Sequence, residues 1–351
     1  MNVNGNSNGA PQKDALETLR AAIEQKFNGF ANNASDDDND LTFLQNNTVV
    51  LPTQQEPLLW VNQGEKQEVL ARAGALNIIT GRAKTGKSSV LGALLAGAVR
   101  HKTDLVVDTL GIEVAPCPPD KVVVHIDTEN SDYDYKRQLL NALQRTSHGN
   151  KRPDWLLTAN MRKAPIAKRM AVFERLLHDA LSGGKKIHLI FLDGFTDLLP
   201  SVNDEATAIG FCERFVQLAD EHQTAIVGVI HENQKITSGG GARGWFGSQM
   251  ERKISAHLAV TVENETRQRS IQLLNCRGCG DIAPRLIEFD DDLMRFVSAG
   301  VGQIKVAHRP LKFDKNQIDE MKIMRENGHS YRQIALQFDT SHHTVKKCII
   351  N

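Results

Sequence analysis

From about residue 52 onward, short apolar runs alternate with longer segments whose apolar residues recur at helical spacing. Most of the short runs are continuously apolar, whereas a strand with one solvated face alternates apolar and polar residues. Continuous runs are typical of strands buried on both faces of a mainly parallel sheet. The six predicted strands cover residues 75–80, 121–127, 187–193, 224–231, 256–263 and 269–275.

Helices are predicted between several of these strands. Regular alternation of strands and helices predicts an α/β domain with a mainly parallel central sheet, here over residues 51–300. The last two strands follow one another closely, so the final part of the sheet is expected to be antiparallel. The sequence AGVGQ at 299–303 indicates a linker, which we place at 301–312. The predicted helices cover residues 87–100, 133–146, 167–181 and 207–222.

The first 50 residues differ in composition from the rest, being rich in Asn, Gly, Ser and Asp, with an acidic run at 36–40. We expect most of this arm to be disordered. Residues 14–27 place apolar side chains at helical spacing, which predicts a short amphipathic helix that docks on a neighbouring surface. A frayed tail without function is the alternative.

The strongest motif is GRAKTGKS at residues 81–88, which fits the phosphate-binding loop pattern G-x-x-x-x-G-K-[ST] at every position. An apolar strand precedes it, and an Ala- and Leu-rich helix follows it. Glycines let backbone N–H groups converge on phosphate oxygens, Lys87 reaches the β- and γ-phosphates, and Ser88 is placed for Mg²⁺. We therefore predict a site for ATP and Mg²⁺. Its nucleotide-binding residues are Gly81, Arg82, Ala83, Lys84, Thr85, Gly86, Lys87, Ser88 and Ser89.

Polar residues end three other predicted strands, and the carboxyl ends of strands are where open α/β sheets bind ligands. Asp193 ends one run and is expected to bind the metal ion, with capping of a turn as the alternative. Asp127 and Glu129 end another, and Glu129 is the candidate base for the water that attacks the γ-phosphate. His231 ends a third run, where it can hydrogen-bond the γ-phosphate or have a structural role.

The order of these motifs resembles that of the RecA-like ATPase core. The stretches that carry the resemblance lie within residues 70–297 and read GRAKTGKS, VVVHIDTEN, IFLDGFTDLLPSVNDEATA, VGVIHENQK and GARGWFGS. Within that fold, the sequence is similar to hexameric replicative helicases of the plasmid RepA type, alongside the DnaB and KaiC relatives. The resemblance implies a ring, usually of six subunits, with ATP sites between subunits. It also implies Lys87 and Ser88 as ligands of nucleotide and Mg²⁺, Glu129 as catalytic base, Asp193 as the metal-side acid and His231 as γ-phosphate sensor.

Sites of this kind commonly take an arginine from the next subunit, which offsets charge that develops on the transferred phosphoryl group. Arg277 follows the last predicted strand where DnaB-like relatives place Lys-x-Arg, although Asn275 stands at the lysine position here. Arg243 and Arg252 are competing candidates. The motif Cys276-Arg277-Gly278-Cys279 also has C-x-x-C spacing, but a zinc site needs a second cysteine pair, and the sequence has none.

The Gly-rich stretch KITSGGGARGWFG at 235–247 resembles the loop that faces DNA in the channel of RecA-like rings. Positive charge from Lys235 and Arg243 and the aromatic ring of Trp245 suit single-stranded DNA, which is bound by phosphate pairing and base stacking. The alternative is a flexible lid whose aromatic residues pack back on the core.

Residues 313–351 predict a small all-α domain with helices at 315–326, 331–338 and 342–350. Residues 328–347 resemble the helix-turn-helix of resolvase and invertase DNA-binding domains; they read GHSYRQIALQFDTSHHTVKK. Asp339 stands where the turn usually has Gly. A small protein–protein module is the alternative. The third helix would present five residues to the major groove of duplex DNA, namely His342, His343, Thr344, Lys346 and Lys347.

Composition changes this picture little. The 351 residues carry 42 Lys+Arg against 42 Asp+Glu, so nucleic-acid contact must come from local basic patches. Five cysteines without framework spacing fit a reducing compartment. The longest apolar run, residues 90–99, is too short to cross a bilayer, and the N-terminus has no secretory pattern. We expect a soluble cytoplasmic protein without membrane contact.

These observations predict an ATP-hydrolysing RecA-like ATPase that acts on DNA, as a helicase-type motor in the replication of a plasmid or mobile element. A first alternative keeps the ATPase but makes it a clock or a loader. A second alternative is a DNA-binding regulator in which bound ATP controls only assembly. A motor should hydrolyse ATP faster with single-stranded DNA, whereas a regulator should depend on duplex sequence through residues 330–350.

Overall fold

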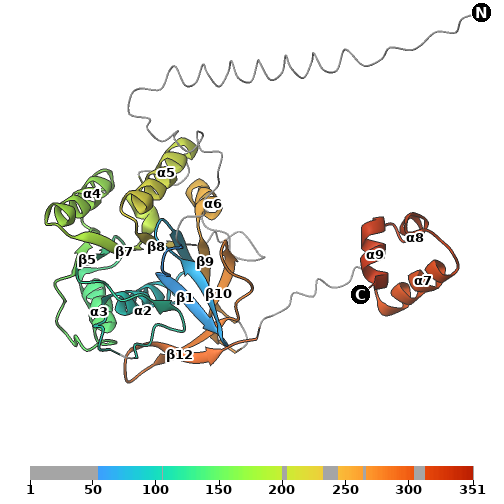
Figure 1. Ribbon diagram of the computed structural model, residues 1–351, viewed down its shortest axis with the longest axis horizontal. Coiled ribbons are helices and arrows are strands. Elements are labelled where there is room, and N and C mark those ends of the chain that lie inside the picture. The colour runs from blue at the N-terminus through green and yellow to red at the C-terminus, as the bar shows by residue number, and fades with distance from the viewer. Residues whose placement is uncertain are drawn as a thin grey trace, which may run out of the picture. The chain divides into compact units, whose positions relative to one another are not determined.

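The computed structural model describes residues 54–104, 106–199, 204–231, 244–263, 266–303 and 313–350 (Figure 1). At 244–246, 315, 347 and 350 it describes only the backbone. The predicted N-terminal arm lies outside the described residues, as do Lys235 and Arg243. Within the described part of the chain, every helix is too short or too polar to cross a bilayer.

A nine-stranded sheet forms the centre of the larger unit. Six neighbouring strands run parallel, and three further strands add an antiparallel edge. The predicted α/β fold with a mainly parallel sheet and an antiparallel end is confirmed. The order is β12 (Arg295–Val301), β11 (Arg285–Asp290), β10 (Arg269–Cys276), β9 (Ala256–Val262), β3 (Leu76–Gly81), β8 (Ala225–His231), β7 (Lys186–Asp193), β5 (Lys121–Asp127) and β6 (Leu156–Asn160).

Helices cover both faces of this sheet (Figure 1). On one face, α2 (Lys87–Val99) and α3 (Asp132–Leu143) pack on a core cluster that includes Ile79. On the other, α4 (Ile166–Ser182), α5 (Glu205–Glu221) and α6 (Gly244–Lys253) pack on a second cluster that includes Ile78. Because consecutive residues of β3 belong to opposite clusters, both faces of the strand are buried, as its continuous apolar run predicts.

Six of the strands that the structure describes were not predicted from the sequence. A separate three-stranded sheet contains β1 (Leu59–Gln63), β2 (Lys66–Ala71) and the two-residue β4 (Glu113–Val114). In the main sheet, β11 and β12 are partly exposed and mix polar with apolar residues, so they lack the continuous apolar signal, and β6 is buried only at its first residue. The predicted linker at 299–303 is wrong for 299–301, because these residues complete β12 and pair with β11.

The C-terminal residues form a helical unit with its own core. The helices are α7 (Lys315–Glu326), α8 (Tyr331–Gln337) and α9 (His342–Ile350), close to the predicted bounds. Asp314 and Ser330 begin α7 and α8 with reciprocal capping boxes. Asp339 takes the left-handed conformation, φ 44°, that the turn of a helix-turn-helix requires. The buried side chains of this core are Phe313, Met321, Ile334, Ala335, Val345 and Cys348.

Candidate nucleotide site and DNA-binding elements

The loop between β3 and α2 has the backbone of a phosphate-binding turn. Gly81, Lys84 and Gly86 all have positive φ, and Gly86 is the N-cap of α2. A Cβ atom on Gly81 would lie 2.6 Å from the carbonyl oxygen of Val260, so only glycine fits there. Arg82, Ala83 and Lys84 are exposed at the tip, while Ser88 and Ser89 lie half-buried in the first turn of α2.

The Lys87 ammonium group lies at the centre of this loop. Its Nζ donates to the carbonyl oxygens of Gly81 and Arg82, both at 2.9 Å, and the side chain is buried. Thr85 Oγ1 also donates to the Arg82 carbonyl, at 3.0 Å. The first turn of α2, which is fully described, carries no acidic side chain, so the positive end of the helix dipole is not neutralised locally. Cation and helix end together favour an anion such as a phosphate group.

Two carboxylates lie side by side next to the loop. Asp127 and Asp193 end the paired strands β5 and β7 in register, and each is only 1% exposed. Burial, together with repulsion from Asp127, raises the pKa of Asp193 to about 7, while the Ser88 hydroxyl lowers it. Asp193 Oδ1 is buried and has no hydrogen-bond partner among the described residues. An orphaned carboxylate oxygen beside a serine hydroxyl fits Mg²⁺, which takes hard oxygen ligands.

Asp127 has a structural role in the strand-end turn. Its Oδ1 accepts from the backbone N–H groups of Glu129 and Asn130, at 3.0 and 2.8 Å. Its Oδ2 accepts from Asn130 Nδ2 at 2.8 Å, and the same amide donates to Asp193 Oδ2 at 3.2 Å. Burial raises the pKa of Asp127 despite these bonds. The geometry thus separates the two acids at this strand end: Asp127 shapes the turn, and Glu129 faces the site.

Glu129 is paired with the residue that ends β8. His231 Nε2 lies 2.9 Å from Glu129 Oε1, and the side chains are 38% and 28% exposed respectively. The hydrogen bond from His231 lowers the pKa of Glu129 more than burial raises it, and Lys87 lowers it further. His231 also pairs in register with Gly81, the first loop residue. The structure therefore brings Lys87, Ser88, Glu129, Asp193 and His231 to one edge of the sheet.

Two further residues position this cluster and were not predicted. Thr128 Oγ1 donates to the carbonyl oxygens of Asp193 and Gly194, at 3.1 and 2.9 Å, which ties the ends of β5 and β7 together. Gly194 has φ 84°, and a Cβ atom there would lie 2.2 Å from Thr128 Oγ1 and 2.7 Å from Glu129 Cγ. The Asp-Gly pair after an apolar run is the sequence signal that could have identified this turn.

Arg277 lies away from this cluster. It follows Cys276, which pairs with Ala256 of β9, and Ala256 pairs in turn with Asn77 near the start of β3. Arg277 therefore lies at the amino edge of the sheet, roughly 13 Å along β3 from Gly81 at 3.3 Å per residue. Its guanidinium donates to the carbonyl oxygen of Arg252, so both candidates share that edge. Neither is brought to the P-loop of its own chain.

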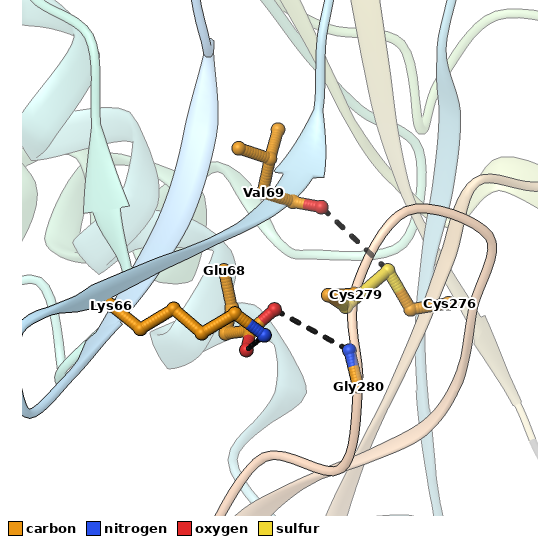
Figure 2. The surroundings of a disulfide bond; sticks show 6 residues. All are labelled: Lys66, Glu68, Val69, Cys276, Cys279 and Gly280. Atoms are coloured by element: carbon orange, nitrogen blue, oxygen red, sulfur yellow. Dashed lines mark hydrogen bonds and ion pairs between the residues drawn. A yellow bond between two sulfur atoms is a disulfide. The ribbon is translucent and has the colours of Figure 1, made fainter.

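A disulfide closes the turn that carries Arg277 (Figure 2). Cys276 and Cys279 are bonded with their Cα atoms 5.8 Å apart, a pairing that was not predicted from the C-x-x-C spacing. Figure 2 shows the turn beside β2, where Gly280 N donates to the buried carboxylate of Glu68 at 3.3 Å. Among the described residues no group of three or more His, Cys, Asp and Glu side chains has the geometry of a metal site.

The predicted DNA-binding residues fall in two elements. The Gly-rich stretch is not a loop throughout, because α6 begins at Gly244 and contains Trp245, whose side chain is outside the described residues. In α9, His342, His343 and Lys346 are exposed and Thr344 is half-buried, while the Lys347 side chain is outside the described residues. Ser341 Oγ accepts from Thr344 N at 3.2 Å and so begins the helix.

Two protein-family models match parts of this chain. A family model described as an AAA domain matches residues 41–235, more than half of the 351-residue chain. The chain belongs to this AAA domain family. A second model, described as the helix-turn-helix domain of resolvase, matches residues 309–349. No curated protein matches the chain.

The AAA domain match covers the P-loop, both carboxylate strand ends and His231. The resolvase-type match covers the three C-terminal helices up to residue 349, including the capping boxes of α7 and α8. This member of the AAA domain family is therefore a P-loop ATPase that also carries a helix-turn-helix DNA-binding domain.

Proposed function

We propose that this AAA domain protein is a ring-forming ATPase, hexameric in the manner of RepA-type helicases, that couples ATP hydrolysis to movement on DNA. The observation that carries the proposal is the convergence of Glu129 and His231 on the edge of the sheet that holds the P-loop. A nucleotide-binding domain that only held ATP would need Lys87 and the loop, but not a carboxylate paired with a strand-end histidine.

Glu129 is the proposed general base. Its lowered pKa keeps the carboxylate ionised near neutral pH, so it can accept a proton from the water that attacks the γ-phosphate. The bond to His231 occupies one of its oxygens. We expect His231 to exchange that bond for one to the γ-phosphate when ATP is bound. Gly194 and Thr128 hold the turn in which Glu129 lies.

Lys87 and the start of α2 are proposed to bind the phosphates of ATP, together with the backbone of residues 81–89. Ser88 and Asp193 would hold Mg²⁺, which neutralises charge on the phosphate oxygens when bound. Because the raised pKa of Asp193 lies near 7, this carboxylate must lose its proton to serve as a ligand. A positively charged ion favours that loss.

DNA is the proposed partner, through two routes. The helix-turn-helix would bind duplex DNA with His342, His343, Thr344, Lys346 and Lys347. The stretch at 235–247, with Lys235, Arg243 and Trp245, would contact single-stranded DNA in the ring. Arg277 would act on the site of the next subunit, which agrees with its position far from its own P-loop.

A second candidate function is a DNA-binding regulator or loader in which hydrolysis controls only assembly. The observation that favours it is the compact, separately capped helix-turn-helix, a fold suited to duplex rather than single-stranded DNA. Its recognition helix presents few side chains, so several copies in a ring would gain affinity by avidity.

The steady-state rate of ATP hydrolysis separates the two candidates when measured without DNA, with single-stranded DNA and with duplex. Strong stimulation by single strands supports the motor. Slow turnover that does not respond to single strands supports the regulator. Truncation after Val301 adds a control, because removal of the helix-turn-helix should spare the DNA-free rate and weaken duplex binding.

A further inference from the structure

A cavity opens at the amino edge of the sheet, where the parallel strands begin, away from the P-loop. It has a volume of about 430 Å³, within the 300–1,000 Å³ range typical of small-molecule sites. Its lining comes from the segment after α2 and from the segments before β5, β6 and β7. The helix α2, 13 residues long, separates it from the P-loop by about 20 Å at 1.5 Å per residue.

One wall of this cavity is aromatic. The ring of Trp155 meets that of His101 edge-on, with centroids 5.2 Å apart, and that of His148 with centroids 5.4 Å apart. His148 is fixed by a hydrogen bond of 2.8 Å to the Val99 carbonyl oxygen. The indole N–H of Trp155 is buried and has no hydrogen-bond partner among the described residues. A ligand oxygen that reached it would supply a bond that the described chain does not.

The rim of the cavity is cationic. Arg100, Lys102 and Lys185 line it against a single carboxylate, Asp154. Arg100 is committed to Glu113, 4.0 Å away, whereas Lys185 Nζ donates only to a neutral carbonyl, that of Pro119. Within the described part of the chain, neither Lys102 nor Lys185 lies within ion-pair distance of a carboxylate. Two exposed ammonium groups are therefore available to an anion.

The segment that presents these groups is held in place. Asp104 accepts from the backbone N–H groups of His101 and Ser147, at 3.0 and 3.3 Å, so the turn after α2 is tied to the segment after α3. A fixed aromatic wall beside two unpaired cations is the combination that binds a planar base together with its phosphate.

We propose that this cavity is a second nucleotide-binding site, which takes one unit of single-stranded DNA. The base would pack against Trp155 and His101, and the phosphate would pair with Lys102 and Lys185. The proposal extends the DNA-acting function proposed above, yet the cavity shares no residue with the P-loop. A free nucleotide has the same chemistry as a unit of the strand, so the test compares both.

The test uses the full chain with saturating Mg·ADP, which occupies the P-loop. Fluorescence anisotropy of a labelled oligo(dT) gives the affinity of the wild type, of the double variant Lys102→Glu/Lys185→Glu and of the control Lys168→Glu, an exposed lysine of α4. We expect the double variant to bind oligo(dT) at least about tenfold more weakly at low salt. The slope of the logarithm of the binding constant against the logarithm of the salt concentration should be smaller in magnitude by about 1.4, as expected for two lost phosphate contacts. The control should stay within about twofold of the wild type.

Photo-crosslinking locates the contact. An oligonucleotide that contains 5-iodouracil should crosslink to Trp155, in the tryptic peptide that spans residues 152–162. Competition by dTMP as strong per nucleotide as that by oligo(dT) would identify a free-nucleotide site, and competition by oligo(dT) alone would identify the strand. Either result supports the shared chemistry of the proposal.

Three results would overturn it: equal affinity of the double variant and the wild type, absence of the crosslink, or equally strong competition by an oligoglutamate peptide. The last would mean a site for any polyanion. The DNA-free ATPase rate is measured in parallel on each variant. An unchanged rate with lost DNA affinity shows that the P-loop function and this site fail independently.

Discussion

At the carboxyl ends of β5, β7 and β8, acidic and polar side chains gather beside the P-loop, whereas cationic side chains line a cavity at the amino ends of β5, β6 and β7. The carboxyl edge holds Asp127 and Asp193 almost fully buried, with raised pKa values. The amino edge holds Arg277 in its disulfide-closed turn and the exposed Lys102 and Lys185. We propose that the first edge binds a metal ion and the reacting phosphate, and that the second contacts anions or a second subunit.

The two edges show that one parallel sheet can carry different chemistry at the two ends of its strands. All parallel strands end at the same edge, so side chains far apart in sequence meet there without long loops. Asp127 can be buried because it accepts from the backbone N–H groups of Glu129 and Asn130 and from the Asn130 amide, which also donates to Asp193. The cations of the opposite edge need no such shell, because they remain in contact with water.

The contrast between the two edges of the sheet would fail if Arg277 acted at the P-loop of its own subunit. We expect Arg277→Ala to lower ATP hydrolysis by about 10³-fold, as for other arginines supplied in trans, with ATP binding retained. Mixing it 1:1 with Lys87→Ala should restore about one quarter of the wild-type rate, since one site in four then combines an intact Lys87 with an intact neighbour. Arg252→Ala is the matched control and should keep most activity. No recovery on mixing would place Arg277 outside the neighbouring site.

A second test concerns the turn that holds Glu129. Gly194→Ala forces a side chain into a left-handed conformation against Thr128, so we expect a loss of about 1–3 kcal/mol in unfolding free energy. The rate of hydrolysis should fall by about tenfold, because a small displacement of a catalytic group is costly. Gly210→Ala in α5 meets no atom within 4 Å and should stabilise the chain by about 0.5–1 kcal/mol. Equal behaviour of the two variants would remove the positioning role of Gly194.

The buried carboxylate predicts a pH dependence of stability. Asp193 has a pKa of about 7 in the folded chain, while an aspartate in an unfolded chain has about 3.9. The folded state thus binds the proton more tightly, and its stability should fall as pH rises from about 4 to about 7 and then level off. Without Mg²⁺ and nucleotide, Asp193→Asn should flatten this slope and raise Tm at pH 8 by several degrees, since 1 kcal/mol is worth about 2–4 °C in a domain of this size. Parallel Tm profiles for variant and wild type would contradict the assignment.

The smallest expected effect concerns the helix-turn-helix. Lys346→Ala in α9 should weaken duplex binding by roughly three- to fivefold and reduce the salt slope by about 1, as expected for one lost phosphate contact. Lys322→Ala in α7, whose ammonium lies near Asp319, is the matched control and should bind like the wild type. Identical behaviour of the two variants would favour the protein–protein alternative for this domain.

The two edges also differ in how far the sequence predicts them. The strands that carry the P-loop, Asp193 and His231 are continuously apolar, because both of their faces are buried, and their bounds were predicted within about two residues. Glu129 and His231 could be predicted as strand-end residues. Their mutual hydrogen bond could not, since it joins residues 102 positions apart.

Other features depended on contacts that no local pattern records. The strands β11 and β12 expose part of both faces, so their mixed composition lacks the continuous apolar run that predicts a buried strand. The role of Gly194 arises from the approach of Thr128, which lies on a different strand end. The pairing of Cys276 with Cys279 follows from the geometry of one tight turn, which C-x-x-C spacing permits but does not require.

Single-turnover hydrolysis by Glu129→Gln tests most directly whether Glu129 is the general base. Glutamine keeps the size of the side chain and an oxygen for His231, but it cannot accept the proton. We predict that ATP binds as to the wild type while hydrolysis slows by about 10²–10⁴-fold. Hydrolysis at the wild-type rate, with binding intact, would contradict the proposed site.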